Sequence, residues 1–192
     1  MKLFVLTKKS KEEILIDRLK KNDSVAQKEL YDLFSKKMLS ICRSYIKDIH
    51  FAEDCMINGF CKVYHHIQKF QNKGSFEGWV RRIMVNECLT FLRANKTLIY
   101  VDDVRGFNDD FDEDEDDENE ELNFNIQEVL DQLAEPYRLV FNLYVLEDYS
   151  HQEISEMLNI SLSTSKTQLF RAKAKLKEIV LLQKKKRNEK EG

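Results

Sequence analysis

Only one proline and five glycines occur among the 192 residues of the chain. All-β folds built from many tight turns use far more of both residues, so the composition argues against them. Lys, Glu, Leu and Ile dominate instead, and such a composition with so few helix breakers favours helices. The composition therefore predicts an all-α fold.

The chain also lacks a long hydrophobic run. No apolar stretch approaches the roughly 18 residues that a membrane-spanning helix needs. The apolar run near the start, residues 3–6, is too short for the apolar part of a secretory signal peptide. We therefore expect a cytoplasmic protein whose four cysteines are reduced thiols.

Residue patterns for metal binding and catalysis are sparse. Cys61 and His65 lie four residues apart, but no Cys-x-x-Cys pair accompanies them. The acidic string 112–116 suggests a calcium loop, yet Asp117 and Asn123 stand where such loops have Gly and Glu. No glycine-rich phosphate loop or nucleophile elbow is present. We expect no metal, no cofactor and no enzymatic activity.

The net charge of −3 hides an uneven distribution of charge. Segment 102–121 contains thirteen acidic residues and one basic residue, so it carries −12 and the rest of the chain carries +9. The acidic segment cannot bury enough apolar surface to fold by itself, whereas basic folded parts favour nucleic acid or another polyanion. The pattern predicts a first helical domain (1–96), a flexible acidic linker (97–124), a second helical domain (125–181) and a basic tail (182–192).

Apolar residues recur at helical spacing through the first domain. The spacing predicts a short helix within 1–20, a helix that follows a cap at 22–24, a helix over 51–68 and a last helix after the break at 72–75. Trp79 at this spacing is expected to be a core residue rather than a stacking platform. The predicted buried faces contain Ile14, Leu15 and Leu19; Leu30, Leu33, Phe34, Met38, Ile41 and Tyr45; Met56, Phe60, Val63, Tyr64 and Ile67; Trp79, Val80, Ile83, Met84, Cys88, Phe91 and Leu92.

The second domain contains the pattern of a helix-turn-helix. Ser150 and Glu153 fit a capping box before a short helix, and a turn at 159–161 leads into a longer basic helix. In such a motif the second helix can lie in the major groove of DNA. Opposite or beside the predicted buried stripe of this helix lie the candidate DNA contacts Ser163, Thr164, Lys166, Thr167, Phe170, Arg171 and Lys173.

In their order and spacing, these segments resemble the bacterial sigma-70 family, and within it the small extracytoplasmic-function (ECF) group. The likeness covers about residues 23–96 and 126–180. The matching motifs are Ala52-Glu53-Asp54 with Gly59-Phe60-Cys61-Lys62-Val63-Tyr64, Phe70-Gln71, Gly74 to Ile83, Asn86, Phe91-Leu92-Arg93, Leu133 to Arg138, Tyr149 to Leu158, Ser163-Thr164-Ser165-Lys166 and Leu169 to Lys173.

The resemblance implies a sigma factor that binds core RNA polymerase and directs it to promoter DNA, with an anti-sigma factor as a further suggested partner. It assigns the polymerase contact to the helix that carries Asp54, Asn58 and Lys62. It assigns the melted −10 strand to loop 70–78 and the helix that follows it, and the duplex −35 element to the helix-turn-helix. The candidate −10 contacts, which can border one groove, are Arg81, Arg82, Asn86 and Arg93.

Three positions depart from the family pattern. Many members have Gln where Ile57 stands and Asp where Thr90 stands, and many have Leu-Pro where this chain has Leu133-Ala134. The acidic linker is either a solvated spacer or a polyanion that occupies the polymerase channel or shields the basic domains.

Two other functions fit part of the sequence. A stand-alone helix-turn-helix regulator that binds an operator by itself would explain 126–180 but leave the first domain without a role. A helical adaptor that binds only protein would make the basic helix incidental.

Overall fold

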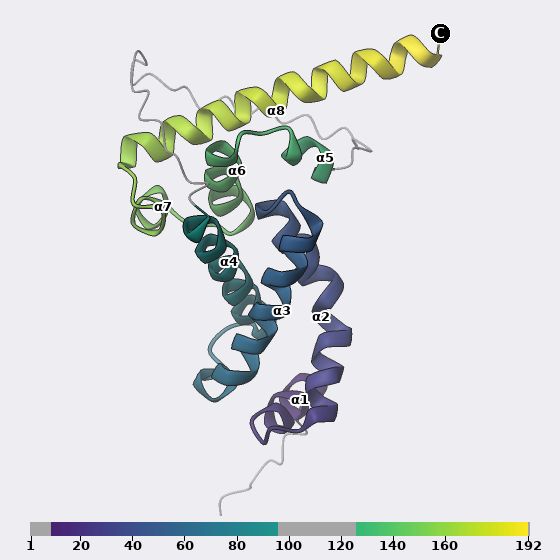
Figure 1. Cartoon of the computed structure of the whole chain (residues 1–192), viewed down its shortest axis with the longest axis vertical. Coiled ribbons are helices and arrows are strands. Elements are labelled where there is room, and N and C mark those ends of the chain that lie inside the picture. Colours follow the sequence, from purple (N-terminus) through teal and green to yellow (C-terminus); the bar gives the residue numbers. More distant parts are fainter. Residues whose placement is uncertain (1–8, 96–125, 192) are drawn as a thin grey trace, which may run out of the picture. The chain divides into compact units, whose positions relative to one another are not determined.

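The computed structural model describes residues 9–95 and 126–191, and these are all-helical without a strand, as predicted (Figure 1). The linker 97–124, with its acidic segment, lies outside the described residues. The chain divides into two compact units, with the division between Leu92 and Arg93.

Four α-helices and one turn of 3-10 helix form the described part of the first unit. Side chains cap three of the helices: Ser10 and Glu13 form a capping box, and Asp23 and Asp48 each accept two backbone N–H bonds. The elements are α1 (Lys11–Leu19), α2 (Ser24–Tyr45), α3 (Ile49–His66), the 3-10 turn η1 (Ile67–Lys69) and α4 (Phe76–Ala94).

The core of the first unit forms where α2, α3 and α4 pack together. Gly59 of α3 lies so close to α4 that a Cβ atom there would stand 2.2 Å from the sulfur of Met84. Most of the predicted stripe residues are buried, but Ile14 is 47% exposed and Leu33 is 63% exposed. Helical periodicity places these two residues beside the buried stripes, but the described residues of this unit leave them largely exposed.

The second unit has a smaller core. Leu130, Leu133 and Ala172 form one buried cluster in it, and Tyr137, Phe141 and Leu176 pack against this cluster. The elements are α5 (Ile126–Asp131), α6 (Glu135–Phe141), the π-helical turn η2 (Asn142–Leu146), α7 (His151–Leu158) and α8 (Leu162–Glu191).

The last helix is longer than the sequence pattern predicts. The sequence separates a basic tail (182–192) from the second domain, whereas α8 continues through Glu191. The tail contains Lys, Arg, Gln and Glu and no proline or glycine before Gly192, so nothing in it interrupts a helix.

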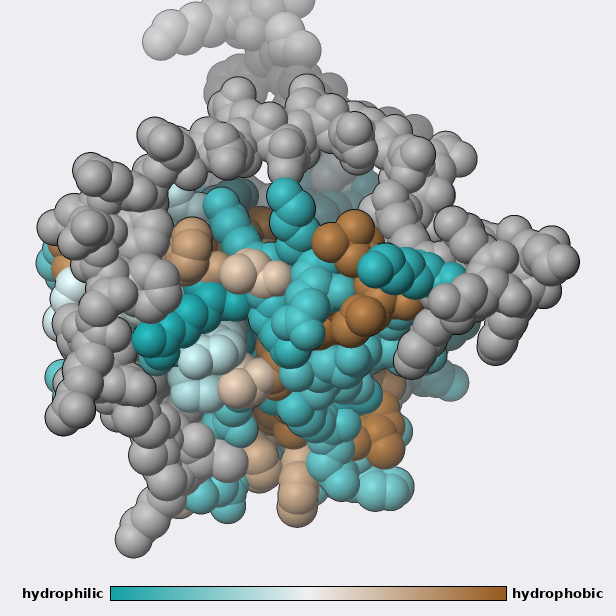
Figure 2. Space-filling model, turned by 90° about the horizontal axis from the view of Figure 1, so that it is seen from above, coloured by the Kyte–Doolittle hydropathy of each residue, from teal (hydrophilic) through white to brown (hydrophobic). Residues whose placement is uncertain are grey.

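The described helices are too short or too polar to cross a membrane. On the face shown in Figure 2, hydrophilic side chains cover much of the described surface and hydrophobic residues lie between them.

Candidate nucleic-acid and polymerase-binding surfaces

One face of α3 is polar and exposed. Asp54, Asn58 and Lys62, which follow each other at one-turn intervals, are all exposed, while Phe60 on the opposite face is buried. Lys62 forms an ion pair with Glu87 of α4. The three predicted polymerase contacts therefore lie on a single face, and one of them also links α3 to α4.

An apolar groove lies beside this face, between α2 and α3. Its volume is about 220 Å³. Ile57 lines the groove and is 50% exposed. The periodicity of the sequence did not identify the residues of α2 that line the groove. The groove's only signal in the sequence is Ile57, an apolar residue among the polar positions of α3. The lining residues are Tyr31, Ser35, Lys36, Leu39, Glu53, Met56 and Ile57.

A second polar face runs along α4. Arg82, Asn86, Thr90 and Arg93 are exposed and follow at steps of four, four and three residues, so they share one side of the helix. The Thr90 hydroxyl donates a 2.7 Å bond to the Asn86 carbonyl. Arg81 is half-buried and lies about 100° around the helix from this face. Three of the four candidates, Arg82, Asn86 and Arg93, therefore share one face of α4, and Arg81 lies beside it.

An exposed loop precedes α4. Residues 71–75 are all exposed, and two of them, Asn72 and Gly74, have left-handed backbones with φ of 54° and 80°. Glycine adopts such a conformation without the strain that a Cβ atom causes. Ser75 closes the loop by accepting a bond from the Gly78 N–H to its hydroxyl.

Aromatic rings hold the two ends of this loop together. The Phe70 ring lies 5.1 Å from Phe76 and 5.4 Å from Trp79, and the Phe76 and Trp79 rings stack at 5.9 Å. Phe76 is buried, and Trp79 is half-buried. Both rings pack as part of the loop stem, but Trp79, which is expected to be a core residue, lies at the edge of the core rather than within it.

The second unit contains the predicted helix-turn-helix. The capping box at the start of α7 is present: Glu153 accepts from the Ser150 N–H at 2.8 Å, and Ser150 accepts from the Glu153 N–H. Asn159 ends α7 with a left-handed backbone, which is typical of a helix C-terminus. The chain then turns into α8, which packs against α7.

The predicted DNA contacts of α8 differ in exposure. Four are exposed and two are half-buried, but Thr164 is buried, which corrects the expectation that it lies on an open flank. Its hydroxyl and that of Ser163 both bond the Ser161 hydroxyl, which also accepts from the Thr164 N–H. The exposed residues are Ser163, Lys166, Phe170 and Lys173, and the half-buried residues are Thr167 and Arg171.

His151 supports α8 from the neighbouring helix and is absent from the predicted set. Its Nδ1 lies 2.9 Å from the Ser165 hydroxyl, and its ring stacks on Tyr144 at 4.6 Å. Burial, followed by the positive charges of Lys166 and Lys173, lowers the pKa of His151 below its ordinary value of 6.5. The imidazole is therefore kept neutral beside a basic surface.

Metal-ligating side chains do not gather within the described residues: no group of three or more His, Cys, Asp or Glu residues could hold an ion there. The acidic string 112–116, with its partial calcium-loop pattern, lies outside the described residues.

Comparison with known proteins accounts for both units. The family model "Sigma-70 region 2" matches residues 30–97, and the model "Sigma-70, region 4" matches residues 123–176. The chain belongs to the sigma-70 family. It is a sigma factor of the ECF group, and hence a transcription initiation factor.

Relatives of this sigma factor include two proteins of Bacillus subtilis. It is 28% identical to ECF RNA polymerase sigma factor SigW over 174 residues, which cover 85% of this chain and 93% of the relative. It is also 28% identical to RNA polymerase sigma factor SigZ over 152 residues, which cover 79% and 85% of the two chains.

Two solved structures are also similar to this sigma factor. CnrH in complex with the cytosolic domain of CnrY has 17% identity, covers 87% of this chain and 95% of that chain, and gives a TM-score of 0.46. The second is the sigma factor RpoE in complex with the anti-sigma factor NepR, from Bartonella quintana. It is 18% identical to this chain, the match covers 80% of this chain and 95% of that chain, and the TM-score is 0.48.

Proposed function

We propose that this sigma factor binds core RNA polymerase and divides promoter recognition between its two units, in the cytoplasm. The observation that carries the proposal is the order of the two family matches, one in each unit, together with exposed polar faces on α3, α4 and α8. A stand-alone operator-binding regulator is not favoured, because it gives no role to the match at 30–97.

The polymerase contact combines the polar face of α3 with the neighbouring groove. Ile57 and Tyr31 provide exposed apolar area at the groove, while Asp54 and Asn58 provide polar groups beside it. A mixture of an apolar centre and a polar rim is typical of protein interfaces. With Ile57 in place of the family's Gln, this position would contribute buried apolar area to the polymerase interface instead of a polar contact. The binding surface itself is kept.

The −10 strand is assigned to α4 and the preceding loop. Arg82 and Arg93 lie eleven residues apart on one face, about 16 Å along the helix, so they can hold separate phosphates of one strand. Asn86 lies between them, and its amide can both donate to and accept from a base edge. Arg81 is assigned a supporting place at the side of this face.

The −35 element is assigned to the exposed face of α8. Lys166 and Lys173 offer charges for phosphates, Arg171 and Thr167 offer donors for base edges, and Phe170, which is 42% exposed, offers an apolar contact for a thymine methyl group or a sugar. Thr164 is assigned a structural role at the start of the helix rather than a DNA contact.

Run-off transcription with purified core polymerase on genomic fragments tests the function as a whole. We expect promoter-specific transcripts only when sigma factor and core are combined. If a housekeeping sigma factor gives transcripts with the same core while this protein gives none from any fragment, the proposal is wrong.

Two asparagine variants separate the assigned surfaces. Asn86→Ala should slow promoter opening about ten-fold, as expected for the loss of ~1.4 kcal/mol of base contact, without changing the affinity for core. Asn58→Ala should weaken the binding of core and leave the opening rate unchanged at saturating core. Permanganate footprinting and a thermal melt of each variant provide the readouts; a folded Asn86→Ala protein that opens promoters at the parental rate contradicts the −10 assignment.

A further inference from the structure

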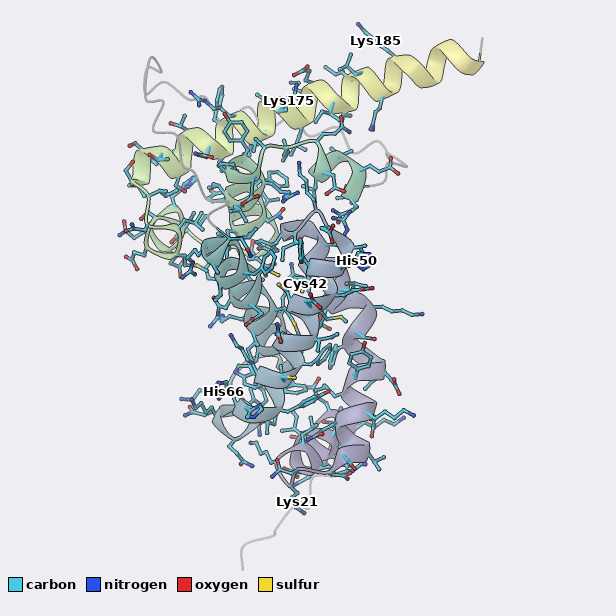
Figure 3. All side chains as sticks on the ribbon, viewed as in Figure 1. Lys21, Cys42, His50, His66, Lys175 and Lys185 are labelled. Atoms are coloured by element: carbon cyan, nitrogen blue, oxygen red, sulfur yellow. The ribbon has the colours of Figure 1, made fainter. Side chains whose placement is uncertain are left out.

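Two hydrogen bonds join the turn between α1 and α2 to the segment that leads into the exposed loop. The Lys20 ammonium donates a 2.9 Å bond to the carbonyl of Phe70, and the Gln68 side-chain amide donates to the carbonyl of Lys20. Each segment thus provides one side-chain donor and one backbone acceptor. Figure 3 labels Lys21 and His66, which lie next to these segments, at the same end of the first unit.

The α1–α2 turn is held firmly on its own side. Lys20 is the C-cap of α1, and the next residues close the turn with bonds from the Lys21 N–H to the Arg18 carbonyl and from the Asn22 N–H to the Leu19 carbonyl. The Arg18 side chain also bonds Asp23, the N-cap of α2, at 2.8 Å. The backbone of Lys20 is therefore held between two helices rather than in a loose loop.

On the other side, Phe70 is the last residue before the exposed loop 71–75. Its N–H bonds the Ile67 carbonyl, and its ring packs against Phe76 and Trp79 at the far end of the loop. Lys20 holds the carbonyl of this same residue. The Lys20 ammonium therefore bonds the peptide group between Phe70 and the first residue of loop 71–75.

We propose that Lys20 and Gln68 form a latch that positions loop 71–75 for capture of the melted −10 strand, with Lys20 as the positioning residue. This inference rests on the proposed function of the loop. It gives α1, which lies before the region-2 match that begins at residue 30, a part in promoter opening. The latch touches no DNA; it acts through the backbone of Phe70.

The alternative is that the two bonds only stabilise the packing of neighbouring segments. A structural contact would change stability and the binding of core together with promoter opening. A positioning contact changes the opening step alone, because a small displacement of a binding group is enough to slow a reaction without unfolding the protein.

The main test compares Lys20→Met with Lys21→Met in the full-length protein bound to core. Methionine keeps the apolar stem and approximate length of lysine but has no donor for the Phe70 carbonyl. We expect Lys20→Met to slow promoter opening about three- to ten-fold, with the affinity for core and for the closed promoter within about two-fold of the parent. Lys21→Met, which changes the same charge at the exposed neighbour, should open promoters at the parental rate, and Lys20→Arg should recover most of the loss.

Gln68→Met removes the other bond of the latch and should slow opening in the same way. Amide hydrogen exchange in the free protein provides a readout without polymerase: residues 71–75 should exchange faster in Lys20→Met and Gln68→Met than in Lys21→Met.

Three results overturn the latch: parental opening with unchanged exchange at 71–75 in both variants, equal losses of core binding and opening, or unfolding of both variants. A parental holoenzyme that opens no promoter instead overturns the proposed function, and the exchange experiment then still decides whether the loop is held by Lys20.

Discussion

Arg171 and Lys173 lie two residues apart on α8 but are held differently by the protein. Arg171 is half-buried, whereas Lys173 is exposed. A side chain that is partly packed loses less conformational freedom on binding and can present its donors in a defined direction. An exposed lysine instead acts as a mobile point charge.

Alanine variants of these two residues should therefore have different effects on −35 recognition. Arg171→Ala should weaken specific binding by about 1–3 kcal/mol and relax the base preference at one position. Lys173→Ala should weaken binding to all sequences evenly and reduce the slope of log affinity against log salt by about 1. Holoenzyme affinities for a set of −35 variants at several salt concentrations check both; equal, sequence-independent losses would make Arg171 a phosphate contact only.

At the scale of helices, the close approach of α3 and α4 depends on the absence of a side chain at Gly59. A Cβ atom there would stand 2.2 Å from the sulfur of Met84, which is itself fully buried. This contact matters for function because the polar faces of α3 and α4 carry the proposed polymerase and −10 residues. Gly78, by contrast, lies in α4 with only the Ser75 side chain near its Cβ position, at 3.7 Å.

Alanine at the two glycines should have opposite effects on stability. Gly59→Ala should destabilise the first unit by about 1–3 kcal/mol, because the buried Met84 side chain must move in a packed core. Gly78→Ala should leave the unit unchanged or stabilise it by up to about 1 kcal/mol, because alanine favours the helix. Denaturant unfolding measures both; a neutral Gly59→Ala would mean that Met84 finds another rotamer without loss of packing.

At the scale of the whole molecule, each unit has its own core and its own titrating groups. In the second unit, the pKa of His151 is lowered mainly by burial. In the first unit, hydrogen bonds from Lys9 and Arg18 lower the pKa values of Asp17 and Asp23 below the ordinary aspartate value of 3.8. As the pH falls below the ordinary histidine pKa of about 6.5, the effect of His151 on the stability of the second unit is therefore expected to change, while Asp17 and Asp23 stay ionised.

Acidification over this range should destabilise the second unit through His151. Because the pKa of His151 is lower in the folded state, its stabilising effect is complete above about pH 6.5 and is lost as the pH falls through the folded-state value. His151→Gln should flatten this pH dependence in residues 126–191 and leave residues 9–92 unaffected. Hydrogen exchange of the full-length protein, resolved by segment, measures the two units together; a matching change in the first unit would show that the units unfold as one.

The sequence by itself determined the helices, two of their caps and the family. Local rules suffice for these features, because the Ser150–Glu153 capping box, the low proline and glycine content and the spacing of apolar residues depend on neighbours along the chain. The polar faces of α3 and α8 follow from the same periodicity. The basic segment after residue 181 is the local exception, because it continues α8 where the sequence pattern predicts a separate tail.

Only the tertiary structure decided which side chains at the margins of these faces are covered. Thr164 is buried beside a local cluster of hydroxyl groups, and Leu33 stays exposed because no distant element packs over it within the described residues. A periodic pattern contains neither kind of information. The groove beside Ile57 needs two helices, and the bond between Lys20 and Phe70 joins residues fifty positions apart. Such contacts depend on how helices pack, and packing is set by the volumes of many side chains together rather than by any one segment.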